Sequence, residues 1–544
     1  MTLTTPTEHP SDPSDPTNPP GHPDDATGAT GASRSPWWFG ALDGIVAGLL
    51  TVGVGTLLAS VLVAMGLAGG QPAPVAAVSE AFIDRTPPWL KDFAISTFGT
   101  NDKRALLVGT VIVLTLLCAA IGVLTRRRMP VGLLAYAVVG AVGGAAVLSR
   151  PGSAPLDVLP VLVGTVLGLW FLRRSALGGL VAPDHLRGDT ADDPGRRWLL
   201  GGGVGLLAAW AGGFIGGGSS AATASREAVA AAPATTAGSL VVPAGADLRI
   251  PGAVPFIVPN DDFYRIDTAI VVPRVDAATW KLKVTGMVER EVEIDWATLQ
   301  GKEQQEAMIT LMCVSNEVGG DLTGNAVWTG WPVRELLAMA GPKAGADMVL
   351  QTSVDGWTCG TPLTTLTDDR NALLATRMNG EPLPFEHGFP VRVVVPGLYG
   401  YVSATKWVTE LKVTTFDADQ GYWTPRGWAP LGPVKTESRV DVPKAGASVP
   451  AGKVAVAGVA WAQHRGISKV EVQVDDGPWT QARLAVDATV DAWRQWVYEW
   501  DATSGSHDLR VRAYDTTGEV QTPYDAPPAP DGATGIHTVT VRVD

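Results

Sequence analysis

Cysteine is scarce in this sequence. The 544 residues include only three cysteines, Cys118, Cys313 and Cys359, too few for a disulfide-stapled scaffold. Cys118 lies inside an apolar run, where we expect it to be a small core residue. An unpaired thiol kept in an oxidising compartment indicates burial or metal ligation. The other two cysteines therefore need an explanation.

Positive charge is also in short supply. The formal net charge is -13 and the chain has no long run of Lys or Arg, which argues against nucleic acid as the main partner because phosphate binding needs a basic face. The arginines that do cluster flank apolar segments, where they would orient the chain in a bilayer. They are Arg126 to Arg128, Arg173 with Arg174, and Arg196 with Arg197.

Histidine is missing from the apolar stretches. The chain has seven histidines, and none lies in a segment that could span a membrane. A membrane haem held by two histidines is therefore excluded. We expect no haem in this chain.

The first half of the chain predicts a tail followed by a membrane anchor. Residues 1–36 are rich in Pro, Asp and Thr, as expected of a disordered tail. Five apolar stretches of roughly 20 residues then predict an all-α, five-helix transmembrane anchor over residues 37–218. These stretches are 37–69, 105–125, 131–149, 155–172 and 198–218.

The flanking arginines set the expected orientation. Placing them on the cytoplasmic side puts the amino terminus inside and everything after residue 218 outside. A transport role has little support, because we expect no ion pair embedded in the spans and only Asp43 is an acidic residue near the start of one. The GRRWLL sequence around Arg196 and Arg197 looks like a twin-arginine export signal or an ordinary positive-inside pair, and both interpretations stay open.

The second half of the chain is globular. Residues 219–250, rich in Ala, Ser, Gly and Thr, predict a flexible linker. Short mixed helix and strand signals then predict an α/β domain over 251–438. From 439 to 544, alternating apolar and polar residues between turn signals predict an all-β, immunoglobulin-like sandwich.

Candidate chemistry gathers around Cys313 and around residues 378–407. A thiolate suits a soft metal, although Cys313 taken alone fits a buried structural cysteine better. His387, Arg392 and Lys406 punctuate an otherwise apolar stretch, where a bound anion would satisfy all three. Structural ion pairs would satisfy them too.

From about residue 251 onward, the chain resembles the sulfite oxidase family of molybdenum enzymes. Four motifs carry the resemblance: Cys313 with Ser315 and Asn316 after it, the MNGEPLP stretch with His387 five residues before Arg392, VVVPG at 393–397, and KW at 406–407. Several ordered motifs in one chain are far more specific than one cysteine.

The resemblance implies that Cys313 binds molybdenum beside the dithiolene sulfurs of one molybdopterin, with Asn316 next to it in the catalytic site. It also implies a set of cofactor-binding residues and a structural role for Cys359, where the family has no thiol. The implied cofactor-binding residues are Asn260, Asp262, Phe263, Tyr264, Asp355, His387, Arg392, Ser403, Thr405 and Lys406.

Two departures from the family bear on the substrate. Glu317 and Val318 follow Asn316 where sulfite oxidases carry an arginine that helps to bind sulfite, and a carboxylate there would repel the dianion. The family's active-site tyrosine has no clear equivalent, since GYWTPRGW offers only Tyr422 and tryptophans. Sulfite is therefore a doubtful substrate.

Together these features predict a multi-pass enzyme of a bacterial plasma membrane, with its catalytic domain on the extracytoplasmic side. It would catalyse two-electron oxygen-atom transfer on a small substrate, using a Mo-molybdopterin cofactor. Without a fused haem domain, electrons would pass to or from a separate partner, a cytochrome or a quinone-linked protein. The sandwich would pair two subunits as a homodimer. The alternatives are a sulfoxide or N-oxide reductase of the same family, and an exported binding module that has lost the metal.

Overall fold

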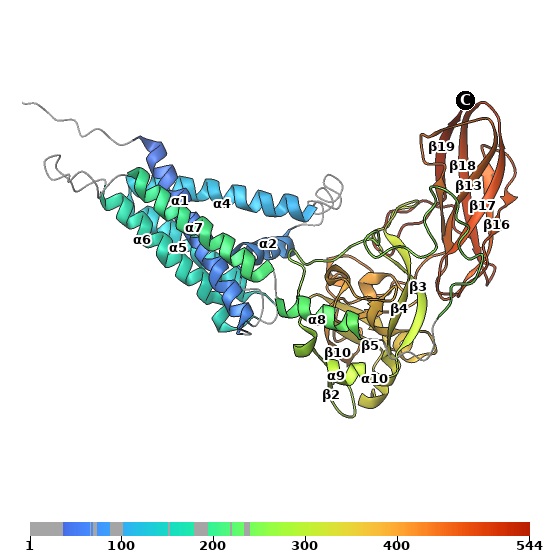
Figure 1. Ribbon diagram of the computed structural model, residues 1–544, viewed down its shortest axis with the longest axis horizontal. Coiled ribbons are helices and arrows are strands. Elements are labelled where there is room, and N and C mark those ends of the chain that lie inside the picture. The colour runs from blue at the N-terminus through green and yellow to red at the C-terminus, as the bar shows by residue number, and fades with distance from the viewer. Residues whose placement is uncertain are drawn as a thin grey trace, which may run out of the picture.

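The computed structural model describes residues 36–65, 67–68, 73–86, 102–150, 153–178, 194–217, 220–232 and 240–544. Figure 1 shows three parts along the long axis. We call them the anchor (residues 36–217), the central domain (240–436) and the C-terminal β domain (437–544). The disordered tail predicted for residues 1–36 lies outside the described residues, apart from Pro36, which precedes the first helix.

The anchor is a bundle around its first long helix. Its helices are α1 (Trp37–Ala64), α2 (Pro74–Arg85), α4 (Asp102–Arg127), α5 (Met129–Leu148), α6 (Leu159–Gly178) and α7 (Pro194–Gly217), with a 3-10 turn at Pro155–Val158. Helix α1 packs against α4, α6 and α7. At Gly44 of α1, an added methyl group would lie 1.9 Å from the carbonyl oxygen of Cys118, so this close approach of α1 and α4 requires glycine.

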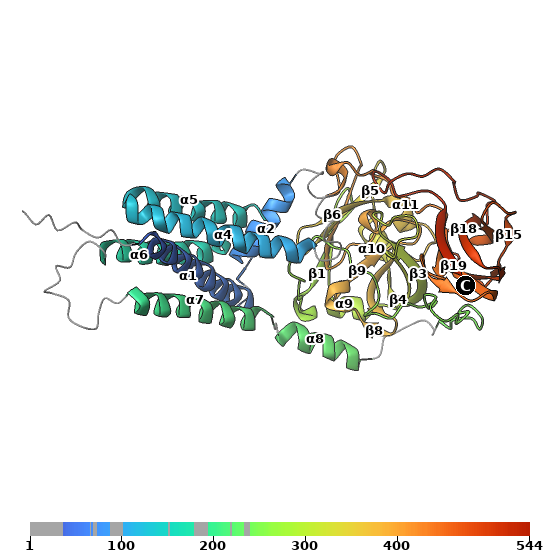
Figure 2. The same ribbon diagram turned by 90° about the horizontal axis from the view of Figure 1, so that it is seen from above.

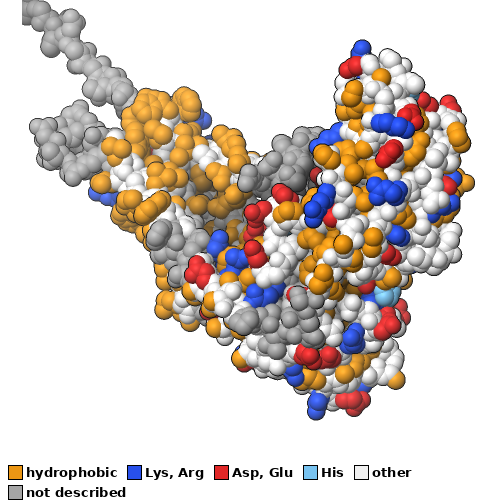
Figure 3. All heavy atoms as spheres, turned by 45° about the vertical axis from the view of Figure 1, so that its right-hand side comes forward, with side chains coloured by type: hydrophobic (Ala, Val, Ile, Leu, Met, Phe, Trp, Pro, Cys, Tyr) orange, Lys and Arg blue, Asp and Glu red, His pale blue; other side chains and the backbone are white. Residues whose placement is uncertain are grey.

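Four helices of the described residues are long and apolar enough to cross a membrane. They are Trp37–Ala64, Ala105–Arg127, Met129–Leu148 and Pro155–Leu177. Figure 3 shows hydrophobic side chains over much of the face of the anchor that is turned to the viewer. Leu116 and Leu134 are 65% and 66% exposed. Both observations suggest membrane insertion. The fifth predicted span forms helix α7, which packs on α1, and its crossing stays a prediction.

A buried ion pair joins three anchor helices. The carboxylate of Asp43 in α1 accepts a hydrogen bond from Arg126 Nε of α4 at 2.6 Å and another from Trp198 Nε1 of α7 at 2.9 Å. Asp43 is only 3% exposed. The prediction that no ion pair is embedded in the anchor is therefore wrong, because Arg126, expected to flank a span, turns back to meet Asp43. Both carboxylate oxygens are used between helices, which indicates a structural role.

Replacing Asp43 with asparagine should destabilise the anchor by about 3 kcal/mol, because it removes the buried carboxylate charge that faces the Arg126 guanidinium. Equilibrium unfolding of the full chain in mixed micelles measures this effect. Glu80→Gln is the matched control, since Glu80 faces Arg150 at 3.9 Å. Loss of the Glu80 charge should lower the free energy of unfolding clearly less than Asp43→Asn does. Equal effects of the two changes would contradict the structural role of Asp43.

The predicted linker contains a docked helix. Residues Ser220–Ala231 form α8, which lies between α7 and the central domain in Figure 2. Arg226 of α8 donates hydrogen bonds to the carbonyl oxygens of Leu383 and Pro382 at 2.9 and 3.0 Å. In return, Arg377 donates to the carbonyl oxygen of Val229 at 2.6 Å. Residues 220–231 of the predicted linker are therefore helical, because their alanines favour a helix and Arg226 binds the next domain. Flexibility of the rest of residues 219–250 stays a prediction.

The central domain has the predicted mixture of strands and short helices. One sheet has the order β2-β1-β10-β5-β6 and the other β3-β4-β7-β8, with β9 beside β7. The strands are β1 (Lys281–Gly286), β2 (Val292–Asp295), β3 (Gln305–Met312), β4 (Thr323–Pro332), β5 (Met348–Ser353), β6 (Thr358–Pro362), β7 (Leu373–Met378), β8 (Glu381–Pro382), β9 (Arg392–Val394) and β10 (Val408–Thr414). The helices are α9 (Trp296–Gln300), α10 (Val333–Ala340) and α11 (Leu363–Thr367).

The C-terminal β domain consists of two sheets around one apolar core, in agreement with the predicted all-β class. Whether its topology is that of an immunoglobulin domain stays a prediction. The sheet orders are β11-β13-β17-β16 and β12-β19-β18-β14-β15. The strands are β11 (Glu437–Val442), β12 (Ser448–Val449), β13 (Gly452–Trp461), β14 (Ile467–Val474), β15 (Thr480–Gln481), β16 (Arg483–Leu484), β17 (Arg494–Ala502), β18 (Gly505–Asp515) and β19 (His537–Val543).

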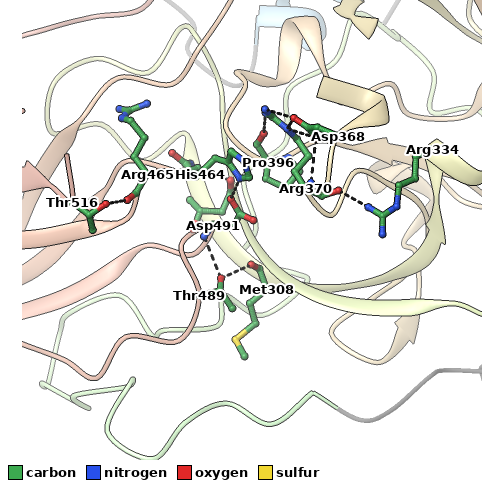
Figure 4. A network of polar contacts seen from close by, with 12 residues as sticks. Met308, Arg334, Asp368, Arg370, Pro396, His464, Arg465, Thr489, Asp491 and Thr516 are labelled. Carbon is green, nitrogen blue, oxygen red and sulfur yellow. Dashed lines mark hydrogen bonds and ion pairs between the residues drawn. The ribbon is translucent and has the colours of Figure 1, made fainter. Parts of the chain in front are cut away.

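The C-terminal β domain covers the open edge of strand β3. Thr310 N–H donates to the carbonyl oxygen of Asp491 at 2.9 Å, and Gln463 Nε2 donates to the carbonyl oxygen of Thr310 at 3.1 Å. Figure 4 shows the same junction from close by, with the Thr489 hydroxyl donating to the carbonyl oxygen of Met308 and His464 facing Asp491 at 3.2 Å. An edge strand is thus closed by another domain.

Candidate active site

Cys313 follows directly on strand β3, at the start of the loop to β4. Its N–H donates to the carbonyl oxygen of Leu322 at 2.9 Å, which closes the loop. The buried Asn316 side chain accepts from Leu322 N–H at 2.8 Å and donates to the carbonyl oxygen of Glu317 at 3.0 Å. The asparagine amide therefore fixes the shape of the loop, and the loop fixes the position of the cysteine.

The Cys313 side chain is buried, with 9% of the residue exposed. Burial raises the pKa of its thiol, while hydrogen bonds from Ser315 and the charge of Lys406 act in the opposite direction. The pKa of Tyr264 is raised, mainly by burial and also by the charge of the Cys313 thiolate. The charge of Arg392 acts in the opposite direction. Cys313 is therefore near enough to Lys406, and Tyr264 near enough to Cys313 and Arg392, for their charges to act on one another.

Arg392 is a buried cation without an acidic partner. It is 4% exposed and lies over the Trp328 ring at 5.0 Å. Its terminal nitrogens donate only to the carbonyl oxygens of His387 at 3.2 Å and Ala404 at 3.4 Å, and its Nε is unpaired among the described residues. Burial lowers the pKa of Arg392 to about 10. A charge held in this way needs an anion to compensate its lost hydration.

Lys406 is also buried but has a counter-charge. Its Nζ bonds Asp267 at 3.0 Å and the carbonyl oxygen of Glu386 at 2.8 Å. Burial lowers the pKa of Lys406 to about 8, against the attraction of Asp267. The nearby Asp355 carboxyl has a raised pKa, mainly through burial and also through the charge of Asp267.

His387 and two aromatic residues form the adjoining wall. The His387 ring meets the edge of Phe263 at 5.6 Å, and Phe263 stacks on Tyr264 at 5.2 Å. His387 Nε2 lies 3.2 Å from the carbonyl oxygen of Asn260. Burial, together with the charges of Lys406 and Arg392, lowers the pKa of His387 to about 3. This histidine is therefore neutral at ordinary pH. Because a carbonyl oxygen can only accept, Nε2 carries the proton and donates to Asn260, and Nδ1 is left as an acceptor.

Some predicted site residues use their side chains within the protein. Ser403 Oγ donates to the carbonyl oxygen of Tyr399 at 2.9 Å, and Thr405 Oγ1 lies 3.3 Å from Cys359 Sγ. The Asn260 amide bonds Asn379 at 2.9 Å. These residues would offer a ligand mainly their backbone groups. Asp262 is exposed at the surface, away from the buried groups.

Three residues that the sequence analysis missed contribute to the site. Asp267 is the counter-charge of Lys406, Arg265 pairs with the same carboxylate at 3.0 Å, and Trp328 supports Arg392. Arg265 and Asp267 follow directly on the predicted site residues Phe263 and Tyr264, so their position was a usable signal. The tryptophan lies in β4, and only the folded chain brings it beneath the guanidinium.

The residues present fit a metal-bearing organic anion. A buried thiol supplies a soft metal ligand, and an unpaired buried guanidinium beside a lysine supplies charge for a phosphate. The site therefore has separate places for a soft metal and for an anionic group.

Comparisons with known proteins agree with this geometry. The family model described as "Oxidoreductase molybdopterin binding domain" matches residues 269–423, which include Cys313, Arg392 and Lys406. Sulfite oxidase from Gallus gallus is 28% identical over 323 residues, covering 50% of this chain and 69% of that protein. The oxidoreductase YuiH of Bacillus subtilis is 33% identical over 156 residues, covering 28% of this chain and 74% of that protein.

The match spans less of the mammalian relatives, at 58% of the mouse sulfite oxidase. Among solved structures, the sulfane dehydrogenase SoxCD from Paracoccus pantotrophus is similar at 26% identity and a TM-score of 0.46, covering 53% of this chain and 81% of that chain.

The fold and the site thus define an oxidoreductase with a molybdopterin-binding domain. The chain belongs to the sulfite oxidase family of molybdopterin-dependent oxidoreductases. This membership implies a Mo-molybdopterin cofactor.

Proposed function

We propose that this chain is a membrane-anchored enzyme of the sulfite oxidase family whose central domain works outside the cytoplasm. The observation that carries the proposal is the buried Cys313 thiol grouped with Arg392 and Lys406. When bound, Mo-molybdopterin supplies two-electron redox chemistry and oxygen-atom transfer to or from a small substrate. The protein supplies position, charge and the exclusion of water.

Each group in the site has a proposed role. Cys313 binds the metal, and Asn316 keeps the Cys313 loop in shape. Arg392 and Lys406 neutralise the phosphate of the cofactor, while Nδ1 of neutral His387 accepts a hydrogen bond from the pterin. Phe263 and Tyr264 form the apolar wall. The remaining proposed contacts, made mainly through backbone groups, come from Asn260, Asp262, Asp355, Ser403 and Thr405.

The proposed partners are an electron-transfer protein, the membrane and a second copy of the chain. Electrons must reach or leave the buried site through a separate protein, which we propose to be a cytochrome or a quinone-linked protein. The anchor would hold the enzyme beside such a partner at a bacterial plasma membrane, and the C-terminal β domain would pair two copies. The helices Trp37–Ala64, Ala105–Arg127, Met129–Leu148 and Pro155–Leu177 support the membrane location.

Glu317 favours a neutral substrate. This exposed carboxylate lies on the Cys313 loop, where sulfite oxidases have an arginine. A negative charge at the entrance repels a dianion such as sulfite and leaves a neutral sulfoxide or N-oxide unaffected. A reductase of sulfoxides or N-oxides is therefore the second candidate function.

A substrate screen with Glu317→Gln separates the two functions. The purified enzyme is tested for sulfite oxidation with an artificial electron acceptor and for sulfoxide and N-oxide reduction with an artificial donor. We expect the variant to lower KM for sulfite roughly tenfold, since one repulsive charge is gone, and to leave KM for a neutral substrate unchanged. An unchanged KM for sulfite would contradict the repulsion. Folded protein inactive in every assay and free of metal would favour the binding module.

A further inference from the structure

Glu437, the first residue of β11, is a buried carboxyl group that the proposed reaction does not use. It is 4% exposed, and its Oε1 has no hydrogen-bond partner among the described residues. The nearest cation is Lys435, but Lys435 Nζ bonds Asp531 at 3.1 Å and the carbonyl oxygen of Gly532 at 2.7 Å instead. A carboxyl group left alone in this way is costly unless it is neutral or bonded to something else.

Two further groups with unused hydrogen-bonding capacity lie beside it. The Tyr399 hydroxyl is fully buried next to the backbone of Lys435, whose N–H faces its oxygen, and next to Gly532, and its own proton has no acceptor among the described residues. The charge of Glu437 raises the pKa of Tyr399, in addition to the larger effect of burial, so the two groups are close. Trp461 is the cross-strand partner of Glu437 in the β11–β13 pair, and its Nε1 is also unpaired.

The three groups lie at the junction of two domains. Directly opposed residues of an antiparallel pair point to the same face of the sheet, so the Trp461 indole and the Glu437 carboxyl share a face. Tyr399 comes from the central domain. A methyl group added at the next residue, Gly400, would lie 3.7 Å from the carbonyl oxygen of Met312.

The chemistry of these groups selects a small neutral ligand. The indole N–H can only donate, the carboxyl can accept and, when protonated, donate, and the phenol can do both. A cation would be repelled by the indole N–H, which can only donate a hydrogen bond. An anion would be repelled by the oxygens of the carboxyl group. A water molecule accepts from the indole and donates to the carboxyl, so it satisfies all three groups together.

We propose that Glu437, Tyr399 and Trp461 form an internal water site between the central domain and the C-terminal β domain, in which Glu437 is held as a neutral acid that stores a proton. Burial raises the pKa of Glu437 to about 8, with Lys435 acting in the opposite direction. The charged and titratable groups around it are Tyr399 and Lys435, together with Asp531, which pairs with Lys435.

Infrared spectroscopy of the purified full chain at neutral pH tests the protonated state. We expect a carbonyl stretching band of a protonated carboxylic acid that Glu437→Gln removes. Glu499→Gln, which changes an exposed carboxylate of β17, should leave the band in place. If Glu437→Gln removes no such band, the proposal is wrong.

Tyr399→Phe and Trp461→Phe test the shared water, even if Glu437→Gln does not fold. Each change removes one partner of the water, so the band should move in frequency. A band that stays unchanged in both variants would show that Glu437 does not share a ligand with these residues. A high-resolution crystal structure should place a water within hydrogen-bond distance of Glu437 Oε1 and Trp461 Nε1, and direct bonds among the three side chains would overturn the proposal.

The stored proton also predicts how stability depends on pH. The unfolded chain loses this proton near pH 4.5 and the folded chain near pH 8, so between these values the unfolded state binds fewer protons and stability falls as pH rises. The contribution to the folding equilibrium constant reaches about tenfold per pH unit. Glu437→Gln should flatten the unfolding free energy of the full chain over this window, whereas an unchanged slope counts against a neutral Glu437.

Discussion

Replacing Cys313 with serine is expected to abolish oxidoreductase activity while leaving the protein folded. The hydroxyl has nearly the volume of the thiol, so the closed loop from Cys313 to Leu322 should persist. As a hard, neutral donor it is a poor substitute for a thiolate on a soft metal. Removing a group that merely supports a metal ligand lowers metal affinity or activity about 10–100-fold. Removing the ligand itself should therefore lower activity by more than roughly 100-fold.

Cys359→Ser is the matched control for this change. Cys359 is equally buried and lies beside Thr405 Oγ1 at 3.3 Å, where a serine can make the same contact. We expect it to keep both its metal and its activity. Activity with artificial electron donors and acceptors, metal content and thermal unfolding are measured together. Full activity of Cys313→Ser, or equal losses in the two variants, would contradict the assignment of the ligand.

Replacing Arg392 with methionine should empty the site of its cofactor without harming the fold. The guanidinium is buried with no acidic partner among the described residues, so in the cofactor-free protein its removal should be neutral or stabilising. In the loaded protein, two charge-assisted hydrogen bonds to the cofactor would be lost, at a total of about 3 kcal/mol or roughly 100-fold in affinity. Pterin content after gel filtration and thermal unfolding measure the two effects.

Arg377→Met provides the contrast. Arg377 lies in β7 and donates to the carbonyl oxygens of Val229 and Ala232 at the end of α8, so its loss should loosen α8 and leave pterin content unchanged. The opposite pattern, in which Arg392→Met destabilises the cofactor-free protein and retains full pterin, would assign Arg392 a purely structural role.

The sequence predicted where the main site residues lie because each comes from a short ordered motif. Cys313 follows an apolar strand, and the five-residue spacing puts His387 on the 3-10 turn Phe385–His387 and Arg392 at the start of β9. The rule that buried charges need partners identified Arg392 and Lys406 correctly as ionisable groups in an apolar setting. What a motif could not give was the direction of each side chain. Ser403 and Thr405 have the expected positions, but their hydroxyls bond within the protein.

Contacts between distant segments were out of reach of the sequence. The Asp43–Arg126 pair joins residues 83 positions apart, and Arg126 looked like a flanking charge because its long side chain can turn back. Helix α8 was predicted as flexible because small residues suit linkers as well as helices, and its docking depends on Arg377 far along the chain. The closure of β3 by the C-terminal β domain depends on Gln463 and Asp491, which no local pattern marks.

The most direct test of the central claim is the molybdenum content of the purified full chain, produced in cells that make the cofactor and measured by elemental analysis. The account predicts about one molybdenum atom per chain, retained in Cys359→Ser and lost in Cys313→Ser. Folded protein without molybdenum, or with the same content in both variants, would contradict the claim that Cys313 holds the metal.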